Sequence, residues 1–124
     1  LPNASLRHYY SAAKAVLNDH WRDMRSQGFV SNRLFDAGAC GAGIVTDDME
    51  ACRALFGDTV QYYRTPAELA AAVDHLRQAT PRKDKGKNKL RELILAKHTF
   101  AHRVDDILRV VARLAPLAAP QVPQ

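Results

Sequence analysis

The sequence predicts an α/β fold with about three parallel strands flanked by helices. Short apolar segments alternate with helix-like segments along most of the chain, and strands that are separated by helices pair in parallel. Three strands make about half of a doubly wound domain, so we expect the second half of a Rossmann-like domain, closed by C-terminal helices. The length of 124 residues suffices for one small domain with its own core.

The first predicted elements are a helix and a buried strand. Residues 5–12 are helix-like, and residues 13–18 (AKAVLN) form a short segment with an apolar centre. Such a segment is typical of a strand inside a parallel sheet. Residues 19–30 are mostly polar and contain one glycine, so a long loop is predicted after this strand.

A second helix and a second strand follow the loop. Ser31 or Asn32 can cap a helix over residues 33–39, because both side chains can accept a hydrogen bond from a first-turn amide. Gly41 ends that helix. Residues 42–46 (AGIVT) then predict a second buried strand.

A short helix leads to the third predicted strand. Asp47 and Glu50 have the spacing of a capping box for a helix that ends at Phe56. A turn at Gly57 follows. Residues 59–63 are rich in β-branched and aromatic side chains, which favour a strand.

Three helices complete the predicted domain, which spans residues 1–115. Residues 65–68 (TPAE) place Thr at the N-cap, Pro at the first helical position and Glu at the third. Each helix is marked by apolar side chains at helical spacing. These are Leu69, Val73 and Leu76; then Leu90, Leu93 and Ile94; then Phe100, Val104, Ile107, Leu108, Val111 and Leu114. Residues 116–124 hold three prolines and are expected to form a disordered tail.

Charge and composition argue against several classes of protein. The net charge of +5 comes from residues 82–91 (RKDKGKNKLR), because the rest of the chain is balanced. This run has no interleaved aromatic residues, so we interpret it as a solvated helix start or loop and expect no nucleic acid partner. No apolar run is long enough for a membrane helix, and no signal peptide is evident. Cys40 and Cys52 lie beside apolar residues and are expected to be buried, reduced thiols of a cytoplasmic protein.

A candidate ligand site lies after the first strand. Ligands of open parallel sheets bind beyond the carboxyl ends of the strands. The loop there leads to a helix start, whose free N–H groups and positive dipole end suit a diphosphate. Gly28 would let the backbone approach the ligand, and Arg25 and Arg33 could contact phosphate oxygens.

Asp36 and two loop residues extend this candidate site. The Asp36 carboxylate could accept two ribose hydroxyls; alternatively, it forms a surface ion pair with Arg33, which is three residues away on the same helix. His20 could touch a sugar or a phosphate, or serve a structural role. Trp21 either anchors the core or covers a base.

No metal site is expected. His98 and His102 are four residues apart, but no Cys, Asp or Glu joins them at ligand spacing, so structural roles are expected for both. Asp47 and Asp48 are adjacent and do not form the Asp-x-Asp pair of a metal-dependent transferase.

Residues 32–47 (NRLFDAGACGAGIVTD) resemble the donor-site signature of GT-B glycosyltransferases, in which an acidic residue and Ala are followed by Ala-Cys-Gly and a strand that ends near Thr. The segment is similar to group 1 enzymes of the spore-maturation type, where Arg-x-Phe-Glu replaces Leu-Leu-Glu. The similarity continues through residues 65–69 (TPAEL) and 98–103 (HTFAHR) and covers residues 9–108.

The resemblance implies transfer of a sugar from a nucleoside diphosphate sugar to an acceptor hydroxyl, with no cofactor and no bound metal. Asp36 aligns with the second acid of the family's paired-glutamate motif, which holds the ribose. Arg33 and Arg25 would stabilise the leaving diphosphate. The substrate-binding residues are then Gly28, Ser31, Asn32, Arg33, Asp36 and His20. The acceptor site usually lies in an N-terminal domain that this chain lacks, so the chain alone is expected to be inactive.

Two departures from the family pattern keep a second interpretation open. Asp36 is one methylene shorter than the usual Glu, and the first acid, expected near Gln27 or Gly28, is absent. Both fit a non-catalytic α/β interaction module derived from a glycosyltransferase. A response-regulator-like switch is a weaker third interpretation, because no acidic cluster follows the first strand. The exposed edge of a half-sheet also predicts a surface for pairing with a second copy.

Overall fold

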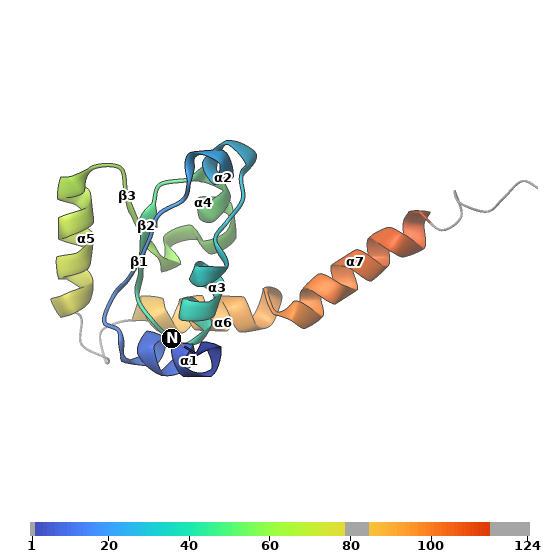
Figure 1. The fold of residues 1–124 in the computed structure, drawn as a ribbon, viewed down its shortest axis with the longest axis horizontal. Coiled ribbons are helices and arrows are strands. Elements are labelled where there is room, and N and C mark those ends of the chain that lie inside the picture. Colours follow the sequence, from blue (N-terminus) through green and yellow to red (C-terminus); the bar gives the residue numbers. More distant parts are fainter. Residues whose placement is uncertain (1, 79–84, 115–124) are drawn as a thin grey trace, which may run out of the picture.

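A three-stranded parallel sheet organises the computed structural model, which describes residues 2–78 and 85–114 (Figure 1). The strands lie in the order β1 (Val16–Asn18), β2 (Ile44–Asp47) and β3 (Gln61–Tyr63). The register pairs Asn18 with Thr46 and Thr46 with Tyr62. The predicted α/β class and the parallel half-sheet are confirmed.

Helices cover both faces of this sheet. On one face lie α3, α4 and α6, and on the other lies α5, which packs on β3 and β2 (Figure 1). The helical elements in the described ranges are α1 (Asn3–Ala12), α2 (Arg22–Gln27), α3 (Asn32–Ala39), α4 (Glu50–Phe56), a 3₁₀ turn (Gly57–Thr59), α5 (Pro66–Gln78), α6 (Lys85–Lys97) and α7 (Phe100–Leu114). The predicted tail, residues 116–124, lies outside the described residues.

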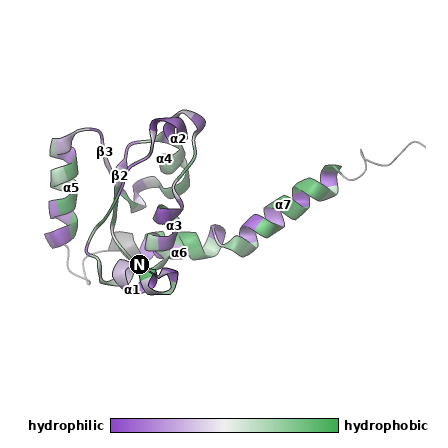
Figure 2. Ribbon diagram, in the orientation of Figure 1, coloured by the Kyte–Doolittle hydropathy of each residue, from purple (hydrophilic) through white to green (hydrophobic). Residues whose placement is uncertain are grey.

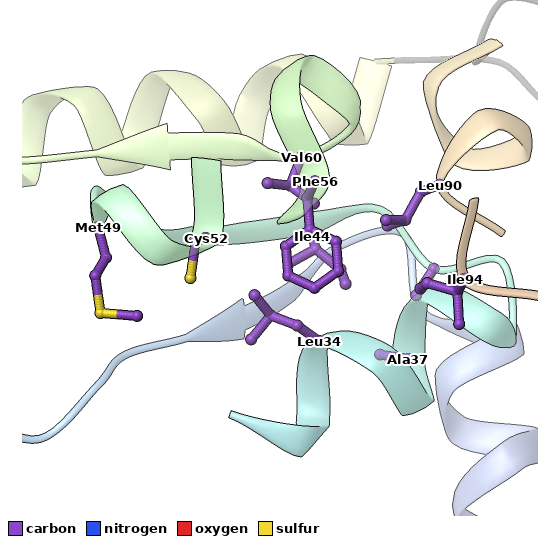
Figure 3. Packing of buried hydrophobic residues seen from close by; sticks show 10 residues of the cluster. Leu34, Ala37, Ile44, Met49, Cys52, Phe56, Val60, Leu90 and Ile94 are labelled. Carbon is purple, nitrogen blue, oxygen red and sulfur yellow. The ribbon is translucent and has the colours of Figure 1, made fainter. Parts of the chain in front are cut away.

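The main core fills the space between the sheet and α3, α4 and α6. Figure 3 shows Leu34, Ile44 and Phe56 meeting at its centre, each at most 2% exposed. A smaller cluster, centred on Val45 and Leu76, lies under α5. Because β2 runs between two neighbouring strands and under helices on both faces, every one of its residues is buried.

Close packing of α3 on α6 depends on Gly38. A Cβ atom at this position would lie 2.5 Å from Ile94 Cδ1 and 3.0 Å from Leu90 Cδ2. Both α6 side chains are buried, and Leu90 is fully so. The small residue therefore lets α6 approach α3 and complete the main core.

Helix capping follows the sequence at two of the three predicted positions. Thr65 Oγ1 accepts from the Glu68 N–H at 3.2 Å, and Glu68 Oε2 accepts from the Thr65 N–H at 3.3 Å, which completes the capping box of α5. Ser31 Oγ accepts from the Arg33 N–H and caps α3. The expected capping role of Asp47 in a box with Glu50 is wrong: α4 starts after Met49 with no side-chain cap, and Asp47 belongs to β2.

Three further expectations about the N-terminal half need correction. The predicted loop over residues 19–30 contains α2, a short helix closed by Gly28. Trp21 is 81% exposed and is no core anchor. Leu17 was expected inside a buried strand but is 50% exposed, because α5 packs on β2 and β3 and not on β1.

The C-terminal helices close the fold only in part. Helix α6 packs on α3. Helix α7 projects away from the sheet, and Figure 2 shows its mixed apolar and polar surface. Its apolar stripe is exposed throughout, with Ile107 at 61% and Leu108 at 58%. The predicted amphipathic stripe exists, but no described residue covers it.

The cysteines are free, and only one of them is fully buried. Cys52 is buried in the main core, whereas Cys40 at the end of α3 is half-buried. Among the described residues, no helix is long and apolar enough to cross a membrane.

Candidate functional site

A buried polar cluster lies where β1 and β2 end. The register places Asn18, the last residue of β1, beside Thr46, and Asp47 ends β2. Asn18, Thr46 and Asp47 are at most 3% exposed. Asn18 Nδ2 donates to Thr46 Oγ1 at 3.2 Å, and Thr46 Oγ1 donates to Asp47 Oδ1 at 3.2 Å. Asn18 Oδ1 is buried without a hydrogen-bond partner in the described structure.

His20 joins this cluster to the start of α3. Its Nδ1 lies 2.5 Å from Asp47 Oδ1, and its Nε2 accepts from the Ser31 N–H at 3.1 Å. Because Nε2 accepts, the proton of the neutral ring lies on Nδ1 and points at the carboxylate. The imidazole is 4% exposed. It therefore fixes the cap residue of α3 relative to the tip of β2.

Arg25 is held by the same carboxylate. Its NH1 donates to Asp47 Oδ2, and its NH2 donates to the carbonyl of Asp48 at 3.4 Å. The side chain of Arg25 is 45% exposed. Helix α2 places Arg25 in its last turn, so this unpredicted helix positions the guanidinium.

Gly28 ends α2 in the left-handed conformation, with a φ angle of 70°. The Gly28 N–H donates to the carbonyl of Arg25, and the Phe29 N–H donates to that of Met24 at 2.9 Å. This arrangement is the usual glycine C-cap of a helix. The left-handed backbone conformation is by itself a sufficient reason for glycine at position 28.

The first turn of α3 presents one amide without an acceptor. Ser31 Oγ accepts from the Arg33 N–H, and the Ser31 carbonyl accepts from the Leu34 N–H. The Ser31 N–H itself is bound to His20. Among the described residues, the Asn32 N–H has no acceptor. The start of α3 therefore has fewer unpaired backbone amides than the sequence alone suggested.

Arg33 and Asp36 are both exposed on α3, and they form no ion pair with each other or with another described residue. The alternative interpretation of a surface ion pair is therefore wrong. Asp36 faces a cavity of 390 Å³ together with Asn32, and Arg33 does not line it.

This cavity, named here the α3–α7 cavity, lies between α3 and the junction of α6 with α7. Its walls are mostly apolar, with a few polar groups. The lining residues are Asn32, Phe35, Asp36, Ala39, Ile94, Leu95, His98, Thr99, Phe100 and Arg103.

His98 and His102 make packing and hydrogen-bond contacts around the start of α7. The ring of His98 lies 5.7 Å from that of Phe35, and burial lowers the pKa of His98 below its ordinary value. His102 Nδ1 accepts from the Thr99 N–H at 3.3 Å at the start of α7. No group of three metal-ligating side chains occurs within residues 2–78 and 85–114.

The structure thus separates the predicted site residues into two groups. His20, Arg25, Ser31 and the buried cluster gather at the strand tips, while Asn32 and Asp36 line the α3–α7 cavity. Sequence analysis did not identify Asn18, Thr46 and Asp47 as members of a site. Their signal was position: each lies at the carboxyl end of a strand, where a parallel sheet gathers polar side chains.

A parallel sheet with buried polar strand tips beside a capped helix defines an α/β domain of Rossmann-like build. The model of the glycosyl transferase-like family matches residues 1–109, and the chain belongs to that family. The match confirms the resemblance carried by residues 32–47. No curated protein and no solved structure matches the chain.

Proposed function

We propose that this chain forms the donor-binding part of a GT-B glycosyltransferase, which transfers a sugar from a nucleoside diphosphate sugar to an acceptor hydroxyl. The observation that carries the proposal is the start of α3. There the Asn32 amide and the Arg33 guanidinium, neither of them paired with a described residue, stand one helical turn from the Asp36 carboxylate, which no described residue pairs either. Membership of the glycosyl transferase-like family supports the same reaction class.

The diphosphate is bound at the N-terminus of α3. The Asn32 N–H and the positive end of the helix dipole favour an anion there. Arg33 is exposed and can turn its guanidinium to the phosphate oxygens. As the glycosidic bond breaks, negative charge grows on the leaving diphosphate, and the Asn32 amide and the Arg33 guanidinium stabilise it.

Asp36 holds the ribose through its two hydroxyls. A carboxylate accepts two hydrogen bonds from a vicinal diol, and no described cation neutralises this one. Asp36 is four residues beyond Asn32, about 6 Å along the helix axis. That spacing suits a ribose whose diphosphate lies at the helix start.

His20 and Arg25 support this site rather than carry the chemistry. His20 is buried and bonded to both Asp47 and the Ser31 amide, so it positions the cap of α3. Arg25 is paired with Asp47, and its exposed side adds positive charge near the strand tips. Gly28 contributes the turn that leads from α2 toward α3.

An N-terminal domain supplies the acceptor site. The free cysteines fit a cytoplasmic enzyme. The exposed stripe of α7 supports the second candidate, a non-catalytic interaction module, which would bind no nucleotide.

Isothermal titration calorimetry with UDP-, GDP-, ADP- and TDP-sugars separates the two candidates. We expect binding of at least one donor, and loss of that binding in Arg33→Ala and Asp36→Ala. The matched controls are Arg77→Ala and Asp74→Ala, an exposed Arg and Asp also spaced at three, on α5. Absence of binding to every donor would refute the donor-site proposal and favour the interaction module.

A further inference from the structure

We propose that α7 binds the surface of an anionic lipid bilayer, with the helix lying in the plane of the interface and its apolar face among the lipids. No residue assigned above to the donor site takes part, so this binding is independent of the proposed function. Three observations carry it: the exposure of one face of α7, the width of that face, and the position of the positive charge in the chain.

Helix α7 leaves the body of the domain and exposes a row of large apolar side chains (Figures 1 and 2). Each of them is at least 53% exposed, and no residue of α7 is buried. They are Phe100, Val104, Ile107, Leu108, Val110, Val111 and Leu114. A contiguous apolar surface of this kind marks a site of contact with another molecule or with a membrane.

The apolar face is too broad for a single partner helix. At about 100° per residue, these side chains span an arc of about 160° around the helix axis, from Val110 to Leu108 with Phe100 at the centre. A two-stranded coiled coil buries a narrower seam and places polar side chains beside it. Here Leu108 and Val110 occupy the flanking positions. A bilayer interface, by contrast, covers a broad helix face at once.

One cation interrupts this arc without facing the lipids. Arg103 lies near the edge of the arc, beside Val110, and its guanidinium donates to Asp106 on the polar side at 2.9 Å. Asp106 also pairs with Arg109 at 2.9 Å. The ion pairs therefore gather on the face opposite Phe100, as in helices that lie along a membrane surface.

The length of α7 fits a helix that lies on a bilayer. It has 15 residues, and in the described ranges no helix is long and apolar enough to cross a membrane. A charged face opposite a broad apolar one is the pattern of interfacial helices, whereas spanning helices are apolar all round. The geometry of α7 therefore favours a position in the interface.

The positive charge of the chain selects an anionic surface. Residues 82–114 contain ten Lys and Arg against four Asp and Glu, a net charge of +6, while the other residues contain eight against nine, a net charge of −1. Lys89, Lys97 and Arg113 are exposed cations of this region. Basic side chains close to a bilayer are attracted by anionic lipids and gain little from zwitterionic ones. The apolar face and the charge excess thus belong to the same part of the molecule.

Co-sedimentation with vesicles tests this binding. We expect the chain to pellet with vesicles of equal parts phosphatidylcholine and phosphatidylglycerol, and to bind vesicles of phosphatidylcholine alone at least about tenfold more weakly. Ile107→Asp, at an exposed site that does not contribute to the core, should weaken binding to the anionic vesicles by about tenfold or more. Phe29→Asp, at a comparably exposed apolar residue outside α7, is the matched control and should leave binding unchanged.

A fluorescent reporter separates insertion of α7 from adsorption by charge alone. Phe100→Trp in a Trp21→Phe background places the one tryptophan of the chain at the centre of the apolar face. Its emission should shift to shorter wavelength on addition of the anionic vesicles. An unshifted emission of the bound protein would show that the apolar face stays in water, and would overturn the proposal.

Three further results would also overturn it. The first is equal binding to the two kinds of vesicle, and the second is equal binding of Ile107→Asp and the wild type. The third is failure to bind either vesicle together with a dimer, seen by sedimentation equilibrium, that Ile107→Asp dissociates. In that case a second copy of the chain covers α7. Donor binding is measured separately with nucleotide sugars, so none of these results decides the proposed function.

Discussion

His20 and Asp47 form a buried hydrogen bond of 2.5 Å between Nδ1 and Oδ1, although 27 residues separate them in the chain. The bond ties the segment after β1 to the tip of β2. Through the second ring nitrogen, it also fixes the Ser31 amide at the start of α3. The geometry of the candidate diphosphate site therefore depends on a carboxylate that touches neither Asn32 nor Arg33.

Replacing Asp47 should destabilise the fold. Asp47→Ala leaves the buried His20 N–H without an acceptor and removes the partner of Arg25, so we expect a loss of about 2–3 kcal/mol in the free energy of unfolding. Asp47→Asn keeps an acceptor for His20 and should cost less. Urea denaturation measures both. Equal stability of wild type and Asp47→Ala would contradict the role given to this carboxylate.

Gly38→Ala should disturb the contact between α3 and α6. The added methyl meets Ile94 Cδ1 at 2.5 Å, and overpacking of this kind costs about 1–3 kcal/mol. Ile94→Val removes that Cδ1 atom, so the double variant should lose less stability than the two single losses added together. Thermal and urea unfolding of the wild type, the two single variants and the double variant gives this double-mutant cycle. Strict additivity would show that the two helices do not meet at this point.

The acid stability of the fold should depend on Asp48. Its carboxylate accepts from Arg53 Nε at 2.5 Å and from Arg64, and the Arg53 hydrogen bond lowers the pKa of Asp48 below 3.8. The ionised form is thus favoured in the folded state, and its contribution to stability is complete above the unfolded pKa. It is lost as the pH falls through the lower, folded pKa.

Asp48→Asn makes this dependence measurable. The stability difference between wild type and variant should be constant near pH 6 and shrink as the pH falls below 3.8. Urea denaturation at a series of pH values gives the two curves. Asp74→Asn, at an exposed and loosely paired carboxylate, is the control. A difference that is independent of pH would refute the contribution of the ionised Asp48.

The two cysteines should differ in reactivity. Burial raises the pKa of Cys52 to about 11, with Asp47 adding to the shift, whereas Cys40 is half-buried. Because the thiolate is the reactive form, one thiol should react with a maleimide at pH 8 in the native chain. The second should react only in denaturant. Cys40→Ser should abolish the fast reaction, and fast labelling of that variant would contradict the burial of Cys52.

Local signals made much of this fold predictable. The cap at Thr65 and the Ser31 cap need only residues within three positions, and both occur as the sequence indicates. Strand β2 is recognisable because a central parallel strand is buried on both faces and largely apolar. Helix α2 was missed within a polar loop, although Gly28 just past its end is a typical stop signal.

Long-range contacts account for what sequence reasoning missed. The spacing between Asp47 and Glu50 fits a cap, but His20 and Arg25 compete for the same carboxylate from distant segments. The spacing of apolar residues in α7 predicts a helix with one apolar side. It does not predict which residues, if any, pack on that side, and the side is exposed. Asp36 was predicted as a ligand residue from its place on the helix and from the family resemblance, whereas the cavity it faces arises only when α6 and α7 join α3.

The most direct test of the account is amide NMR of the ¹⁵N-labelled chain during titration with a nucleoside diphosphate such as UDP. We predict that the largest shift changes fall on the amides of Asn32 and Arg33, followed by that of Asp36. Saturable shifts confined to other surfaces, such as α5, or no shifts at millimolar ligand, would contradict the claim that the start of α3 binds the donor diphosphate.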